Sequence, residues 1–269
     1  MKKGLLSLIV FLLSQVLTFA QSPSVNEPQT LYDSAHVALQ AGDLLTARKD
    51  LEQIIDTFPN ISNLSVIRKE WGNLMMRIIH SDALSPEAML YEVLPGDALE
   101  KIARNHGTTI ELIKERNKLK TNNIKPGQKL SLWNHPFTIE VFKASNRLDL
   151  KLGNNIIKEY AVSTGKSNTT TPLGEFTIKD RYPNPTWFHH GDIVPGGTPE
   201  NWLGTRWLGF NIPKYGIHGT IYPELIGQSV SGGCIRMKNQ DVEELYDIIP
   251  IGTKVTIMED NLEGKEKNG

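Results

Sequence analysis

The stretch IHGTIYPELIGQSVSGGCIRM, residues 217–237, carries the residues around which the rest of the chain is organised. It holds Cys234, the only cysteine of the chain, and His218, which lies 16 positions before it. A thiol with a histidine near it and glycines directly before it can supply a nucleophile, a general base and an oxyanion site. A buried, inert cysteine beside an unrelated loop histidine is the alternative interpretation.

Residues 1–20 predict a cleavable secretory signal peptide. Lys2 and Lys3 precede an apolar run over residues 5–13, and the run is followed by a small-x-small ending, Thr-Phe-Ala, at residues 18–20. The apolar run is shorter than the ~20 residues that a membrane span needs, so no stable span is predicted. Exported proteins usually pair their cysteines, and a single cysteine is therefore either buried or kept for its reactivity.

The overall charge argues against two classes of partner. The chain has 29 basic and 30 acidic residues and a net charge of −1, with both signs interspersed. This balance favours neither nucleic acid nor an anionic membrane surface as a partner. The length of 269 residues allows more than one domain.

Residues 30–84 have apolar residues at three- and four-residue steps, which predicts helices. Gly42 ends the first helix, Asp43 caps the second, and a third covers residues 64–78. The segment ALQAGDLLTARKDLEQIIDTFPN resembles one tetratricopeptide-type hairpin, and a single such repeat is not stable alone. We favour a helical spacer packed on a neighbouring domain, and a surface for a protein partner is the alternative.

Residues 89–133 predict a strand, two helices and a second strand. Asp97 followed by Glu100 predicts a capping box at the first helix. Thr109 predicts the cap of the second helix, and residues 128–132 predict the closing strand. The order is therefore βααβ in about forty residues.

The stretch YEVLPGDALEKIARNHGTTIELIKERNKLKTNNIKPGQKLSL resembles a LysM domain along its whole length. The resemblance implies binding of glycans that contain N-acetylglucosamine, chiefly peptidoglycan, in a groove between the loop after the first strand and the loop before the second. The implied glycan-binding residues are Gly96, Asp97, Ala98, Leu99, Asn123, Ile124 and Pro126. A folded spacer that does not bind glycan is the alternative.

From residue 137 the hydrophobic period changes to two. The segments FTIEVFK, RLDLKLG, NIIKEYAVSTG and GEFTIKD alternate apolar and polar residues, which predicts strands. Residues 193–210 predict loops, residues 241–249 one helix and residues 254–258 a last strand. Residues 137–259 thus predict a mostly β domain, barrel- or sandwich-like, with one late helix. Residues 260–269 form a polar tail, so the chain as a whole is predicted to be multidomain.

The residue types near Cys234 predict a chemical arrangement. Gly232 and Gly233 can turn their N–H groups toward an oxyanion, and His218 can take the thiol proton. The sequence places no Asp or Asn as the third member of a catalytic triad beside Cys234 and His218, so a backbone carbonyl has to fix the imidazole tautomer. His189, His190 and Asp192 lie in a Pro/Gly-rich loop without a second ligand cluster, so a surface loop is favoured over a metal site.

Five further segments together resemble the YkuD-type L,D-transpeptidase catalytic domain: STGKSNTTTPLGEFTI, PENWLGTRWLGF, YGIHGT, SVSGGCIRM and IGTKVTI. The resemblance implies that Cys234 is the nucleophile and His218 the base. It also implies that the backbone of Gly219 orients the histidine and that the N–H groups of Gly233 and Cys234 form the oxyanion hole. The implied substrate-binding residues are Ser231, Gly232, Arg236, Tyr215 and Trp202. Many members have a histidine where this chain has Gly232, which leaves the nucleophile in place.

The two resemblances imply an exported enzyme of the periplasm or cell wall that needs no metal or organic cofactor. Cys234 would attack a peptidoglycan stem tetrapeptide, release D-alanine and form a thioester, which an amine resolves to a 3→3 cross-link. An L,D-carboxypeptidase or endopeptidase at the same site is one alternative. A non-catalytic wall-binding scaffold is another.

Overall fold

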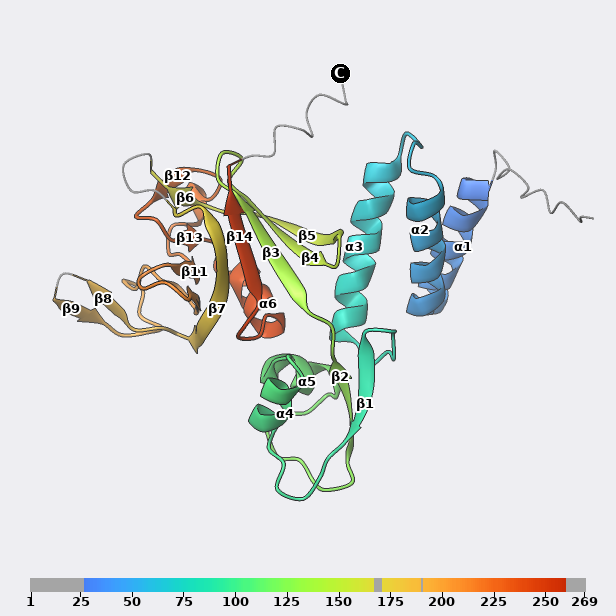
Figure 1. The fold of residues 1–269 in the computed structure, drawn as a ribbon, viewed down its shortest axis with the longest axis horizontal. Coiled ribbons are helices and arrows are strands. Elements are labelled where there is room, and N and C mark those ends of the chain that lie inside the picture. The colour runs from blue at the N-terminus through green and yellow to red at the C-terminus, as the bar shows by residue number, and fades with distance from the viewer. Residues whose placement is uncertain (1–26, 167–170, 190, 260–269) are drawn as a thin grey trace, which may run out of the picture.

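The computed structural model describes residues 27–166, 171–189 and 191–259 (Figure 1). The predicted signal peptide, residues 1–20, and the predicted tail, residues 260–269, lie outside these residues. Within the described part, no helix is both long and apolar enough to cross a membrane. The described chain forms a group of helices, a small two-stranded unit and a large sheet.

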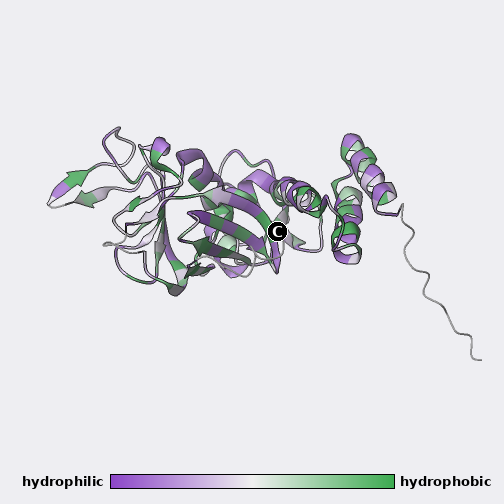
Figure 2. Cartoon of the chain, turned by 90° about the horizontal axis from the view of Figure 1, so that it is seen from above, coloured by the Kyte–Doolittle hydropathy of each residue, from purple (hydrophilic) through white to green (hydrophobic). Residues whose placement is uncertain are grey.

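Three N-terminal helices come first: α1 (Glu27–Ala41), α2 (Leu44–Thr57) and α3 (Leu64–His80). The predicted cap at Asp43 is confirmed, because its Oδ1 accepts a hydrogen bond from the backbone N–H of Thr46 at 3.0 Å. Each helix carries both hydrophilic and hydrophobic residues (Figure 2), and the buried ones join one hydrophobic core. The tetratricopeptide-type hairpin and a protein partner for residues 30–84 stay predictions.

Helix α3 packs against the last strand of the large sheet, β5 (Asn155–Ala161). Trp71 and Leu74 of the helix belong to the same core as Ile157 of the strand. Gly72 lies where the two elements meet, and an added Cβ there would be 2.5 Å from the carbonyl oxygen of Ile157. The missing side chain of Gly72 therefore allows the helix to approach the strand this closely.

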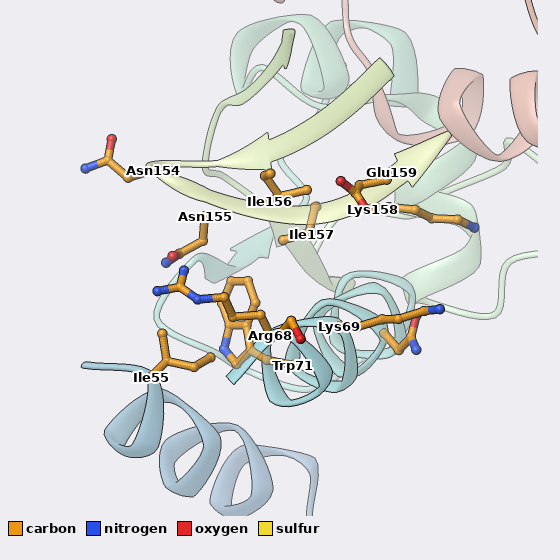
Figure 3. A pocket seen from close by; sticks show the side chains of 12 residues that line it. Ile55, Arg68, Lys69, Trp71, Asn154, Asn155, Ile156, Ile157, Lys158 and Glu159 are labelled. Atoms are coloured by element: carbon orange, nitrogen blue, oxygen red, sulfur yellow. The ribbon is translucent and has the colours of Figure 1, made fainter. Parts of the chain in front are cut away.

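A cavity of about 510 Å³ lies between α3 and β5 (Figure 3). Arg68, Lys69 and Trp71 line it from the helix, and Asn155 and Lys158 line it from the strand. None of the predicted catalytic, substrate-binding or glycan-binding residues is among its lining residues. The cavity is therefore separate from the chemistry that the sequence predicts.

The small unit has the predicted βααβ order. Its elements are β1 (Ala88–Glu92), α4 (Leu99–Asn105), α5 (Ile110–Arg116) and β2 (Lys129–Trp133). β1 and β2 pair in antiparallel fashion, and apolar residues of the strands and helices form a second core beneath them. The predicted cap at Thr109 is confirmed, because its Oγ1 accepts the N–H of Leu112 at 3.0 Å.

The capping box predicted at Asp97 is wrong. The N-cap of α4 is Ala98, and no side chain caps this helix. The carboxylate of Asp97 instead accepts hydrogen bonds from the Tyr91 hydroxyl at 2.7 Å and from the Leu94 N–H at 2.9 Å. These bonds close the turn between β1 and α4, because a short carboxylate competes well for nearby backbone donors.

Arg116 fastens the small unit to the helices and is fully buried. Its Nη1 donates to the carbonyls of Ile78 and Ile79 at 3.0 and 2.6 Å, and its Nη2 donates to the carbonyl of Ala83 and the hydroxyl of Ser131, both at 2.8 Å. The first two carbonyls belong to the C-terminal turn of α3, where a cation is favourable. Burial lowers the pKa of Arg116 to about 10, so the side chain stays charged at neutral pH.

The large sheet has eight strands in the order β13-β11-β10-β7-β14-β3-β4-β5. The strands not yet given are β3 (Phe137–Phe142), β4 (Arg147–Leu152), β7 (Gly174–Pro183), β10 (Arg206–Phe210), β11 (Gly216–His218), β13 (Ile235–Arg236) and β14 (Lys254–Met258). The sheet is curled, and α6 (Asn239–Ile248) packs against it (Figure 1). The prediction of a mostly β region with one late helix is confirmed.

Two short strand pairs and one turn of 3-10 helix complete this region. They are β6 (Thr164–Gly165) with β12 (Ser229–Ser231), β8 (Trp187–His189) with β9 (Asp192–Val194), and η1 (Pro223–Leu225). The loop predicted over residues 193–210 is wrong in part, because its first two residues belong to β9 and its last five form β10. β10 lies between β7 and β11 in the sheet and is the direct neighbour of the strand that carries His218.

Candidate active site

His218 and Cys234 belong to two neighbouring segments at one end of the large sheet, strand β11 and the turn before strand β13. β11 ends at His218, and Cys234 directly precedes β13. The two strands are parallel, with Ile217 opposite Ile235 and His218 opposite Arg236. Because side chains alternate along a strand, His218 and Arg236 share one face, and Cys234 precedes Arg236 by two residues. The short loop and strand thus bring thiol, imidazole and guanidinium to the same edge.

The thiol of Cys234 is half-buried and protonated at neutral pH. Burial raises the pKa of the Cys234 thiol, while the Gly216 N–H and the charge of Arg236 act in the opposite direction. Its Sγ donates a hydrogen bond to the carbonyl oxygen of Lys214 at 3.3 Å. In the described structure the thiol proton is therefore directed to this carbonyl and not to His218.

The imidazole of His218 is buried and held in one orientation. Its Nδ1 lies 2.6 Å from the carbonyl oxygen of Gly219, and since a carbonyl can only accept, Nδ1 carries the proton. The indole of Trp207 stacks on the imidazole, with centroids 5.9 Å apart, and is itself held by a 2.8 Å bond from its Nε1 to Asp180. The neutral ring then has its lone pair on Nε2, which is the form that a general base needs.

Burial lowers the pKa of His218 to about 4. The carbonyls of Gly219 and Leu203 raise this pKa, and the charge of Arg236 lowers it, but the loss of hydration is the largest cause. The imidazole is therefore neutral at physiological pH. The two carbonyls also lie where they can stabilise an imidazolium that forms during a reaction.

Acid should destabilise the protein through His218. Its folded pKa lies below the ordinary value of 6.5, so the unfolded chain binds the proton first and stability is lost as the pH falls from 6.5 to about 4. We expect this loss to be about 3 kcal/mol, measured as the difference in urea-unfolding free energy between pH 7 and pH 4. His218→Gln should lack it. The comparison cancels other groups, such as Asp149, whose pKa burial raises to about 6 and which acts in the opposite direction. Equal losses in both proteins would contradict the prediction.

The turn before Cys234 is braced by Ser231. The Ser231 hydroxyl donates to the carbonyl of Cys234 at 2.6 Å and accepts the N–H of Gly233 at 3.1 Å. Gly233 has a φ of 118°, a backbone conformation that favours glycine. Since the Gly233 N–H is already engaged and Ser231 is buried, this geometry favours the Cys234 N–H as the oxyanion donor and a structural role for Ser231.

The other predicted substrate-binding residues differ in their exposure and contacts. Arg236 is half-buried. Burial lowers the pKa of its guanidinium, while electrostatic interaction with Cys234 and Tyr222 raises it. Trp202 is 40% exposed; its ring stacks on Trp187 with centroids 5.1 Å apart and meets Tyr222 edge-on. Gly232 is exposed and Tyr215 half-buried; an added Cβ at Gly232 would have open space around it.

The predicted glycan-binding residues differ in accessibility. Gly96, Ala98, Asn123 and Pro126 are exposed on the two loops, and a bond from the Gly127 N–H to the Val93 carbonyl joins those loops at 2.8 Å. Leu99 is buried in the small core, Ile124 packs partly on that core, and the Asp97 carboxylate is occupied within its own turn. The Leu99 side chain is therefore a core element and does not face a ligand.

Of the histidine-containing loop, His189 ends β8 and Asp192 begins β9. His190 and the His189 side chain lie outside the described residues. Among the residues that are described, no group of three or more His, Cys, Asp or Glu side chains could hold a metal ion.

Asn239, at the start of α6, also contributes to this site and is not recognisable as a site residue from the sequence. Its Oδ1 accepts the N–H of Thr220 at 3.1 Å and the N–H of Thr205 at 3.3 Å. Thr220 follows the glycine whose carbonyl holds His218. An asparagine beside a helix start ordinarily indicates a cap, so the sequence offered no signal for this contact.

A protonated thiol, a neutral oriented imidazole and a braced glycine turn are the parts that acyl transfer through a cysteine requires. Comparison with known families agrees with this class. Residues 136–257 match the model of the L,D-transpeptidase catalytic domain (YkuD), and residues 91–133 match the model of the LysM domain.

Two relatives from Bacillus species give the same family. The chain is 43% identical over 131 residues to a Bacillus subtilis protein named as L,D-transpeptidase YqjB, covering 47% of this chain and 73% of that protein. It is 38% identical over 176 residues to the Bacillus licheniformis protein named as L,D-transpeptidase YkuD, covering 63% of this chain and 98% of the relative. A solved L,D-transpeptidase from Mycobacterium smegmatis aligns with a TM-score of 0.40 and 17% identity, over 49% of this chain and 63% of that one. The chain belongs to the YkuD-type L,D-transpeptidase family and carries a LysM domain before the catalytic domain.

Proposed function

We propose that this chain is an exported peptidoglycan L,D-transpeptidase in which Cys234 is the nucleophile and His218 the base. The observation that carries the proposal is the neutral imidazole of His218, fixed through Nδ1, on the same sheet edge as the only thiol. The proposal includes the division into a signal peptide (1–20), helices (30–84), a LysM domain (89–133) and a catalytic domain (137–259).

The reaction proceeds in two acyl transfers. The Cys234 sulfur attacks the carbonyl between the third residue of a stem tetrapeptide and its terminal D-alanine, while His218 takes the thiol proton at Nε2. The tetrahedral intermediate collapses, the C–N bond breaks, and the imidazolium returns the proton to the leaving D-alanine amine. A thioester remains on Cys234, and the N–H at Cys234 stabilises the oxyanion of both steps.

An amine resolves the thioester. The side-chain amine of the third residue of a neighbouring stem attacks the thioester carbonyl, His218 accepts its proton, and the C–S bond breaks as the thiol is restored. The product is a 3→3 cross-link. Water in place of the amine gives a tripeptide, which is the carboxypeptidase outcome at the same site.

The LysM domain supports action on peptidoglycan. A glycan-binding module raises the local concentration of the stem peptides that are attached to the same glycan. The exposed Gly96, Ala98, Asn123 and Pro126 form the most accessible part of its proposed groove. The protein is thereby held at the cell wall, in the periplasm or outside the cell.

Product analysis tests the function. The purified chain and its Cys234→Ala variant are each incubated with muropeptides that contain stem tetrapeptides, and the products are measured by mass spectrometry. We expect a dimer that has lost one D-alanine, formed only by the wild-type chain. A monomeric tripeptide alone would assign a carboxypeptidase, and no change with either protein would leave a wall-binding scaffold.

A further inference from the structure

One peptide group connects Asn239 to the imidazole of His218. The carbonyl of the Gly219–Thr220 peptide accepts the Nδ1–H of His218 at 2.6 Å. The N–H of the same peptide donates to Oδ1 of Asn239 at 3.1 Å. The three groups therefore form a continuous chain of hydrogen bonds from the side-chain amide, through the peptide, to the ring.

The surrounding backbone is shaped for this contact. A Cβ added at Gly219 would lie 2.1 Å from Asn239 Oδ1, and one added at Gly204 would lie 2.2 Å from it. Gly204 also has a φ of 64°, in the left-handed region. The same Oδ1 accepts the Thr205 N–H, so it joins the loop before β10 to the loop after β11. The absence of side chains at both glycines therefore leaves room for the amide oxygen of Asn239.

We propose that Asn239 is a positioning residue for His218, acting through the Gly219–Thr220 peptide to hold the imidazole in the Nδ1–H tautomer and in one orientation. The inference deepens the proposed function, since it rests on His218 being the base. Asn239 itself does not touch the ring. Asn239 has the role of the third side chain of a catalytic triad, but a peptide group lies between Asn239 and the histidine.

Two physical effects give Asn239 this role. First, a peptide whose N–H donates a hydrogen bond is polarised by it, so the bond from the Thr220 N–H to Asn239 Oδ1 makes the Gly219 carbonyl a stronger acceptor for Nδ1–H. Second, the two bonds to Oδ1 fix the peptide plane, and the direction of the carbonyl follows that plane. Without the amide oxygen, the N–H groups of Thr205 and Thr220 lose their partner and the peptide is free to rotate.

The test uses the full chain labelled with 15N-histidine, together with Asn239→Ala, Asn239→Asp and the control Gln240→Ala, an exposed neighbour on the same helix turn. The ring nitrogens of His218, assigned by their absence in His218→Gln, report the tautomer by NMR. D-alanine release from tetrapeptide muropeptides reports turnover. Thermal unfolding reports the fold.

We expect wild type and Gln240→Ala to show the single Nδ1–H tautomer at pH 7. Asn239→Ala should show a mixture of tautomers and a kcat lower by about 10–100-fold with little change in KM, because a small misplacement of a reacting group has this cost. A folded Asn239→Ala with wild-type His218 signals overturns the inference. The NMR result stands even where no D-alanine is released, so failure of the proposed function is distinguished from failure of the positioning role.

Asn239→Asp decides the question alone if the alanine variant does not fold. A carboxylate accepts the same two N–H groups and adds a negative charge next to the peptide that holds the ring. We therefore expect this variant to keep the single tautomer and to have a His218 pKa above the wild-type value. The added charge opposes that of Arg236, which lies on the neighbouring strand β13 and lowers the pKa of His218. An unchanged His218 pKa in this variant overturns the inference.

Discussion

Alanine at Cys234 or at His218 is expected to lower the rate of D-alanine release about 10⁴-fold or more. Cys234→Ala removes the atom that forms the thioester, so no acyl-enzyme can accumulate. His218→Ala leaves a thiol whose pKa burial has raised and whose proton is directed to the Lys214 carbonyl, so little thiolate is available for attack. When two residues act in one catalytic unit, removing either one already removes the rate enhancement that they supply together. The double variant should therefore be no slower than either single variant.

Mass spectrometry of the intact protein tests whether each variant has lost the acyl-enzyme. During turnover the wild-type chain should carry a population with the added mass of the tripeptide acyl group, and neither variant should. Gln228→Ala, an exposed position before β12, serves as the matched control and should retain wild-type turnover. Losses that multiply in the double variant would show that Cys234 and His218 act independently, contrary to the proposal.

Replacement of Arg116 by leucine is expected to lower the free energy of unfolding by about 3–5 kcal/mol. The guanidinium is fully buried and donates to three carbonyls and the Ser131 hydroxyl. All four acceptors would lose this bond, although the Ile78 carbonyl would keep its bonds from Ser81. Each buried polar group left without a partner costs about 1–3 kcal/mol. The acceptors belong to α3, to the segment after it and to β2, so the loss should loosen the LysM domain from the helices.

Urea unfolding of Arg116→Leu, with Lys118→Ala as the control, measures this effect. Lys118 forms an ion pair with Asp82 at 3.0 Å, but its side chain is 80% exposed. An exposed pair contributes at most about 1 kcal/mol, so the control should remain close to wild type. Arg116→Lys should fall between the two because one ammonium cannot reach all four acceptors. A leucine variant as stable as Lys118→Ala would contradict the account of Arg116 as a fastening residue.

Regular periodicity made the helices, the LysM unit and the longer strands β3, β4, β5, β7 and β14 predictable from the sequence, whereas the short strands β8 to β13 were not predicted. The strand at residues 206–210 was missed because Gly204 and Gly209 interrupt its pattern. Gly209 has a tertiary reason: an added Cβ there would be 2.2 Å from Asp180 Oδ1 and 2.6 Å from Trp207 Nε1. The glycine makes room for the bond that holds Trp207, and this requirement cannot be read from the local sequence.

Asp97 and Asn239 also have contacts that cannot be predicted from residue type and local position. Both precede or begin a helix, where their residue types indicate caps. The Asp97 carboxylate instead closes a turn with Tyr91, and the Asn239 amide reaches backbone groups of two distant loops. The sequence singled out Cys234 and His218 by residue type and spacing. The parts that orient them depend on which loops the sheet brings together.

The contact between α3 and β5 has a consequence for any shorter version of this enzyme. β5 is the edge strand of the sheet, and an uncovered edge offers unpaired backbone groups to other chains. Residues 136–257, the part that matches the catalytic family model, would leave this edge open and uncover Ile157. Such a fragment is expected to self-associate strand to strand. In the full chain, we expect the packing of α3 on β5 to limit this association.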